Sequence, residues 1–316
     1  LRFRADGASS DLERADLLHR LGELHATSLD DLTTALDTFE EAVSAVPGHA
    51  NTVASLERLV TGQAHRLRIT QILEPLYRDA DEWRKLIAIW EAQVELSDDA
   101  AESARLLGEI ASVHEMRSRD LGLAFNALAR AVVALPSESS ARSELERVAG
   151  VLNAWDELVE TYEAAIEKVK DEDPSLVSEL LGTIARIHDE RRGDPRSAIV
   201  TYERLIALDP NDASPLDALE ALHTLVGDWR GLVDVLGRKV ELTYDPVDRA
   251  EILRRAGSVL EELISDAEGA IALYKRAAEE DANDPVALEA LDRLYAAGGK
   301  NEDLSLIHIS EPTRPY

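Results

Sequence analysis

The chain has 316 residues, enough for two domains or one elongated array, and 45% of them are hydrophobic but only 4% aromatic. Its net charge of −28 disfavours binding to nucleic-acid phosphates and to anionic membranes, and it favours a basic partner. The absence of cysteine excludes disulfides and thiolate metal sites, and no run approaches the roughly 20 apolar residues of a membrane span.

The start of the chain carries little pattern. It begins at Leu1 and its only methionine is Met116, so we expect a fragment of a larger protein. Residues 1–11 are predicted to be disordered or to mark the start of that fragment. Arginine outnumbers lysine, which suggests GC-rich coding DNA and a bacterial source. The compartment stays open, with the cytoplasm favoured.

Four segments of 29 residues align without a gap, beginning at Leu21, Ile110, Ile184 and Ala256. We call them copies 1 to 4. Each contains an alanine, a large residue four positions later and an apolar residue seven positions later, which together form one helix face. These positions are Ala35, Ala124, Ala198 and Ala270, then Phe39, Leu128, Tyr202 and Tyr274, then Ala42, Ala131, Leu205 and Ala277.

One further helix follows each alanine-bearing helix, and a second, tryptophan-led helix follows it in the first three copies. The first is marked by a leucine at constant offset, and the second begins with tryptophan and has leucine three residues later. The leucines are Leu56, Leu145, Leu219 and Leu291, and the tryptophans are Trp83, Trp155 and Trp229. Each period therefore holds four helices, and the periods are residues 12–80, 81–152, 153–226 and 227–303.

The first period is longer because it contains an additional segment, residues 64–81. Its sequence, AHRLRITQILEPLYRDAD, predicts an extra helix that Pro75 should bend or break. No strand pattern of comparable strength appears anywhere. The sequence therefore predicts an all-α protein, a right-handed α-solenoid of antiparallel hairpins with about sixteen helices, each stabilised by its neighbours.

The hairpins resemble tetratricopeptide repeats. AIVTYERLIALDPND, from Ala198 to Asp212, and AIALYKRAAEEDAND, from Ala270 to Asp284, carry the small residue, the aromatic and the exit turn of that family. The tryptophan-led helices look more like the half-a-tetratricopeptide variant. The resemblance covers about residues 12–303, and it implies a protein-binding scaffold whose partner lies on a concave face lined by the first helix of each hairpin.

The histidines do not indicate a metal site. His25, His114 and His188 share one position in three copies, and copy 4 has Leu260 there. A position that accepts histidine or leucine is typical of packing, and sites one period apart cannot meet around one ion. We expect no metal and no cofactor.

The acidic side chains have a structural interpretation too. The acidic stretches SDDAAE, from Ser97 to Glu102, and DEDP, from Asp171 to Pro174, are expected at helix N-termini, where Asp and Ser cap free backbone N–H groups. No phosphate loop, hydrolase elbow or zinc-protease motif is present. Trp83, Trp155 and Trp229 are interpreted as packing wedges between hairpins. The sequence thus predicts that this chain is not an enzyme.

The first-helix positions expected to face the groove have mixed charge. The candidates for partner contact are Arg186, Arg254, Arg255 and Glu261. The leading hypothesis is a non-enzymatic scaffold that binds a protein or peptide, with basic partners favoured. Two alternatives stay open, a docking arm of an enzyme whose catalytic domain is missing and, disfavoured by charge, an RNA-processing helical repeat. The oligomeric state is not predicted.

The end of the chain departs from the repeat. Residues 304–316, LSLIHISEPTRPY, break the helical period, and Pro312 and Pro315 prevent its continuation. LSLIHISEPTR resembles the in-frame translation of the transposase mosaic-end adaptor used in sequencing libraries. We therefore expect residues 304–316 to be a disordered, non-native tail without function.

Overall fold

The computed structural model describes residues 1–60, 62, 65–282 and 284–298. This part of the chain contains seventeen α-helices and no strand, which confirms the all-α prediction. The helices are α1 Arg2–Asp6, α2 Asp11–Ser28, α3 Leu32–Ala45, α4 Ala50–Leu59, α5 Arg66–Asp79, α6 Trp83–Leu96, α7 Ala100–Val113, α8 Leu121–Ala134, α9 Ser139–Leu152, α10 Trp155–Val169, α11 Pro174–Arg186, α12 Pro195–Leu208, α13 Leu216–Val226, α14 Trp229–Leu242, α15 Pro246–Ser258, α16 Ala267–Glu280 and α17 Pro285–Gly298.

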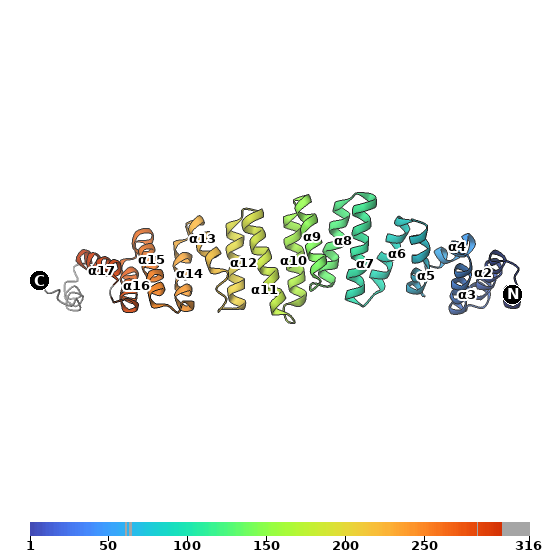
Figure 1. The fold of residues 1–316 in the computed structure, drawn as a ribbon, viewed down its shortest axis with the longest axis horizontal. Coiled ribbons are helices and arrows are strands. Elements are labelled where there is room, and N and C mark those ends of the chain that lie inside the picture. Colours follow the sequence, from blue (N-terminus) through green and yellow to red (C-terminus); the bar gives the residue numbers. More distant parts are fainter. Residues whose placement is uncertain (61, 63–64, 283, 299–316) are drawn as a thin grey trace. The chain divides into compact units, whose positions relative to one another are not determined.

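The helices follow the predicted period of four. The predicted borders at 80/81, 152/153 and 226/227 each fall between two helices, which leaves four helices of α2–α17 in every period. Contacts divide the chain differently, into a first unit, Leu1–Val169, and a second unit that begins at Lys170. The division lies between α10 and α11, inside the third period. Figure 1 shows the helices of each unit in chain order.

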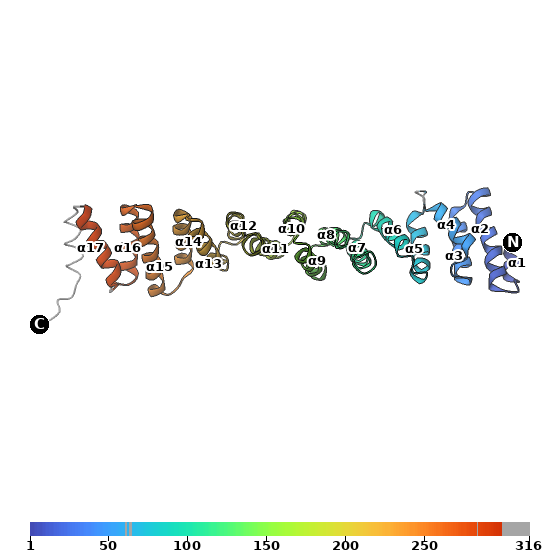
Figure 2. The ribbon, with the colours of Figure 1, turned by 90° about the horizontal axis from the view of Figure 1, so that it is seen from above.

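Within each copy, the first helix packs against the second as a hairpin. The pairs are α2 with α3, α7 with α8, α11 with α12 and α15 with α16, the last two visible side by side in Figure 2. All four repeat alanines, Ala35, Ala124, Ala198 and Ala270, are fully buried. The residues four positions later are buried in three copies, whereas Tyr202 is half-buried.

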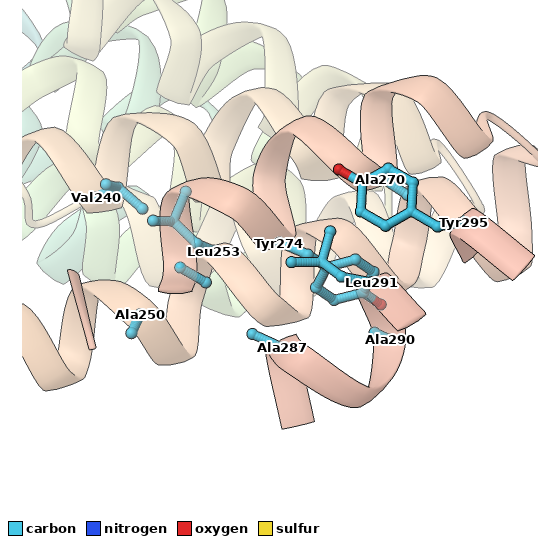
Figure 3. Close-up of a cluster of buried hydrophobic side chains, with 10 residues drawn as sticks. Val240, Ala250, Leu253, Ala270, Tyr274, Ala287, Ala290, Leu291 and Tyr295 are labelled. Atoms are coloured by element: carbon cyan, nitrogen blue, oxygen red, sulfur yellow. The ribbon is translucent and has the colours of Figure 1, made fainter. Parts of the chain in front are cut away.

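The close packing of each hairpin depends on a small residue in the first helix. Thirteen positions before the repeat alanine stand Gly22, Ala111, Ala185 and Gly257. A Cβ on Gly22 would lie 2.5 Å from the ring of Phe39, and one on Gly257 would lie 2.9 Å from the ring of Tyr274. Figure 3 shows Tyr274 within the buried cluster that also contains Ala270 and Leu291. Glycine thus stands in the two copies whose buried partner is aromatic.

One turn geometry joins the two helices of every hairpin. Five residues before the repeat alanine, the backbone is left-handed in each copy, at Asp30, Arg119, Gly193 and Ser265, with φ between 51° and 63°. The next residue is always aspartate, and its side chain accepts a hydrogen bond from the backbone N–H three residues on, capping the second helix. These caps are Asp31, Asp120, Asp194 and Asp266.

The first helices of copies 2 to 4 end in a π-helical turn. These turns are η1 His114–Ser118, η2 Ile187–Arg191 and η3 Val259–Ile264. In each, the N–H of the capping aspartate donates to the carbonyl at the shared histidine position, for example from Asp194 to His188 at 2.8 Å. The same turn and the same bond recur with histidine or leucine, so the side chain at this position packs rather than sets the turn.

The tryptophan-led helices pack through the residues after the tryptophan. Leu86, Leu158 and Leu232 are buried, and so are Trp90, Tyr162 and Leu236 at the seventh position. The leading tryptophans, Trp83, Trp155 and Trp229, are only half-buried, so the predicted wedge is partial. Trp229 lies against a cluster formed by Leu232, Leu236 and Ala256, and Trp155 donates its indole N–H to Asn153 at 2.9 Å.

Helix α5 is assigned as continuous from Arg66 to Asp79, so Pro75 does not break it. Residues 2–6, predicted to lie in a disordered start, form the short helix α1, whose Ala5 is buried against Leu18. The predicted adaptor-like tail, residues 304–316, lies outside the described residues.

Candidate functional site

Three of the four predicted partner-contact residues make ion pairs within the second unit. Arg254 on α15 lies 2.8 Å from the buried carboxylate of Asp284, at the start of α17. Arg255 pairs with Glu220 on α13. Glu261 in η3 receives Arg293 of α17, with the two carboxylate oxygens 2.8 and 2.9 Å from the guanidinium. These side chains connect neighbouring helices.

The Arg255 pair belongs to a larger charged cluster. Glu220 also receives the ammonium group of Lys239 on α14, and Lys239 contacts Asp217 as well. Burial alone raises the pKa of Glu220. The hydrogen bonds from Lys239 and Arg255 lower this pKa by more than burial raises it, so the net shift is downward. Three helices are thereby joined through one carboxylate.

The Glu261–Arg293 contact is one of three similar pairs, which we call the ladder. Each pair joins an acid near the end of the first helix of a hairpin to an arginine on the helix that follows the hairpin. The arginine stands two residues after the repeat leucine of that helix. The other two are Glu23 with Arg58 at 2.7 Å, and Glu115 with Arg147 at 2.6 Å. Glu115 and Glu261 occupy the same position, nine residues before the repeat alanine, and Glu23 lies about one turn earlier.

Copy 3 has no arginine at this place. Its acid is Asp189, equivalent to Glu261, but the residue equivalent to Arg293 is Ala221. Within the described part of the chain, the side chain of Asp189 has no ion-pair or hydrogen-bond partner. Copy 3 thus retains the acid of the ladder and lacks its base.

The charges of Asp189 and Arg186 both act on the phenol of Tyr202. Burial raises the pKa of Tyr202, Asp189 raises it further and Arg186 lowers it, which places both charges near the phenol. In copy 4 the equivalent Tyr274 donates its hydroxyl to Glu261 at 3.2 Å, beside Arg293. The exposed Arg186 donates to Thr183 at 3.3 Å. Of the predicted contact residues, Arg186 is the one beside the vacant position.

Sequence reasoning did not find the ladder, although its signal is present. Arg58, Arg147 and Arg293 stand two residues after Leu56, Leu145 and Leu291. The acids are separated from them by 32 to 35 residues, a distance over which sequence alone does not show contact. Only the fold brings the two positions together.

The shared histidine position is buried in one copy and half-buried in two, and the capping acids lie at helix N-termini. His188 is buried and receives a hydrogen bond from Arg192 at 2.7 Å, while His25 and His114 are half-buried. Asp99 and Asp173 cap α7 and α11. Among the described residues, no group of three histidine, aspartate or glutamate side chains is arranged to hold a metal ion.

None of the helices described combines the length and the apolar character needed to cross a bilayer.

Comparison with known proteins gives weak likenesses only. No family model and no curated protein sequence matches the chain. Among solved structures, YrrB, a TPR protein with an unusual peptide-binding site, is 18% identical with a TM-score of 0.32, covering 64% of this chain and 96% of that one. MamA is 16% identical with a TM-score of 0.30, covering 51% and 88%.

A third similar structure is the C-terminal part of a TPR repeat-containing protein from Cytophaga hutchinsonii. It is 11% identical with a TM-score of 0.33, and the match covers 80% of this chain and 98% of that one. At such scores the fold of this chain is defined by its own helix order and packing.

Proposed function

We propose that this protein is a non-enzymatic scaffold that binds a segment of a partner protein on the first-helix face of its second unit. The observation that carries the proposal is the vacant ladder position at Asp189. Elsewhere in the ladder, an arginine of the same chain neutralises the acid and joins two helices. In copy 3 a basic side chain of the partner takes that place.

The chemistry of the vacant position favours arginine. A guanidinium presents several N–H donors in one plane and binds a carboxylate through two parallel hydrogen bonds. The Glu261–Arg293 pair shows that this face accommodates such a group beside a tyrosine hydroxyl. The acidic net charge of −28 assists the approach of a basic segment. The partner is therefore a protein or peptide with an exposed arginine.

The test compares peptide binding by the wild-type protein with binding by a variant that carries its own arginine beside Asp189. Wild type is incubated with peptide pools in which one position is fixed as Arg, Lys, Glu or Leu and the others are degenerate. We expect enrichment of the Arg pool, followed by the Lys pool. Ala221→Arg places the missing base on α13 and should abolish the enrichment, and Asp189→Asn should do the same.

The matched control is Thr224→Arg, which adds the same charge to an exposed position on the same helix, one turn away. It should retain the enrichment. Equal losses in Ala221→Arg and Thr224→Arg would mean that the peptides sense only bulk charge. The proposal would then fail.

A further inference from the structure

The first unit contains a groove whose lining residues differ from those of the ladder. It lies between α8, the second helix of copy 2, and the tryptophan-led α10, and its volume is about 860 Å³. α8 and α10 contact each other directly, and α7 closes the bottom of the groove with Leu107. A volume of this size is within the range of natural ligand-binding clefts, roughly 300–1,000 Å³.

Two stripes of side chains form the walls. On α8 the stripe is Gly122, Asn126, Ala129 and Val133, and on α10 it includes Thr161 and Ala164. The residues of each stripe are three or four positions apart, so they share one helix face. The small side chains leave the space that makes the groove.

The α8 stripe is uncharged only in copy 2. The same four positions carry Asp37 and Glu40 in copy 1, Arg196 and Glu203 in copy 3, and Glu268, Lys275 and Glu279 in copy 4. In a chain with 30% charged residues, a solvent-facing stripe without charge is unusual, and exposed apolar patches of this kind mark interaction surfaces. Leu152, which also lines the groove, is 41% exposed.

The basic side chains at the groove already have partners. Arg130 forms two hydrogen bonds to Glu91 on α6, at 2.7 and 2.8 Å. Lys168 donates to the carbonyl oxygens of Val133 and Ala134 at the end of α8, which closes one end of the groove.

The acidic side chains at the rim, Glu157 and Glu160, are exposed. Within the described residues, their carboxylates have neither an ion-pair nor a hydrogen-bond partner. The rim therefore offers negative charge above an apolar floor. A second copy of this chain, with its own charge of −28, is a poor occupant for electrostatic reasons.

We propose that the α8–α10 groove docks a basic amphipathic helix of a partner protein. Its apolar residues, spaced at i, i+3, i+4 and i+7, lie over Phe125, Ala129 and Ala164, and its lysines or arginines face Glu157 and Glu160. α8 has 14 residues and α10 has 15, so a docked helix of about four turns matches the wall length. This site is independent of the ladder site at Asp189.

The experiment uses the full chain and a labelled 16-residue helical peptide with leucine at the four apolar positions and lysine on the flanks. A second peptide replaces each lysine by glutamate. Fluorescence anisotropy should show the lysine peptide binding at least tenfold more tightly. Ala129→Glu should weaken it at least tenfold, although the added negative charge would strengthen unspecific attraction. The double variant Glu157→Lys, Glu160→Lys should reverse the preference between the peptides.

The fold should tolerate Ala129→Glu because glutamate already stands at the equivalent position in copies 1 and 3, as Glu40 and Glu203. The control is Ala272→Glu, which adds the same charge to the outward stripe of α16 and should not weaken binding. Equal effects of Ala129→Glu and Ala272→Glu would overturn the proposal. A wild-type dimer that Ala129→Glu converts to monomer in sedimentation would overturn it in favour of self-association.

Discussion

The ring of Tyr274 lies directly over Gly257, so close that an added Cβ on the glycine would come within 2.9 Å of ring carbon Cε1. Both residues are buried, Gly257 on the first helix and Tyr274 on the second helix of copy 4. Gly22 and Phe39 have the same relationship in copy 1. The absence of a side chain at these glycines sets how closely the two helices approach.

Gly257→Ala should therefore destabilise the second unit. Neither the helix backbone nor the buried ring can move freely, and overpacking of this kind costs about 1–3 kcal/mol. Gly237→Ala on α14 is the matched control, since an added Cβ there meets nothing within 4 Å. It should stabilise the helix by up to about 1 kcal/mol. Chemical denaturation of both variants decides, and equal stabilities would refute the packing argument.

Substitutions at the left-handed turn residue should raise protein stability in copy 4 and lower it in copy 3. Ser265 has φ 63°, a conformation that costs an L-residue about 1–2 kcal/mol, whereas copy 3 has Gly193 at this place. Ser265→Gly should stabilise the protein by up to about 1 kcal/mol, and Gly193→Ala should destabilise it by a similar amount. Thermal melts that moved in the same direction for both variants would contradict the expectation.

Alkaline stability should depend on Tyr274. Burial, followed by the charge and hydrogen bond of Glu261, raises its pKa from 10.0 to about 12. Because the folded protein holds this proton more tightly than the unfolded chain, the contribution is complete below pH 10 and declines as the pH rises toward about 12. Tyr274→Phe should flatten that part of the stability profile relative to wild type. Tyr244→Phe, at a 97% exposed position, should leave the profile unchanged.

Removing a ladder arginine should create a second site. Arg293→Ala leaves Glu261 and Tyr274 in the arrangement proposed to bind a partner arginine at Asp189. Because Glu261 is only 17% exposed, leaving its carboxylate without this arginine should cost about 1–3 kcal/mol, which the fold should tolerate. Titration with an arginine peptide selected on wild type should show a stoichiometry that rises from one to two. An unchanged stoichiometry with a folded variant would count against the ladder as the binding template.

The periodicity of the sequence predicts the helices well because burial repeats with it. Ala35, Ala124, Ala198 and Ala270 are all fully buried, and each predicted period border falls between two helices. The π-helical turns could not be predicted, since they depend on how each first helix meets its neighbours and not on a residue preference. The continuity of α5 through Pro75 could not be predicted either, because local propensity alone favours a break at proline.

The candidate site was only partly predictable. Arg254, Arg255 and Glu261 were selected from their place on the first helices, and the fold pairs each with a charge from another helix. Whether they also contact a partner stays a prediction. The vacancy at Asp189 is defined by an arginine that is absent, so it becomes visible only when equivalent contacts in the other copies are known.

In the proposed binding mode, the ladder also determines which acidic position a partner arginine reaches. Arg58, Arg147 and Arg293 are attached to the same chain as their acids, and a tethered group competes at an effective concentration in the millimolar range. A partner present at low concentration is therefore excluded from those three positions by the intramolecular arginines. A single substitution at position 221, between alanine and arginine, would then suffice to open or close the binding position at Asp189. The same exchange at position 58, 147 or 293 would open a different position.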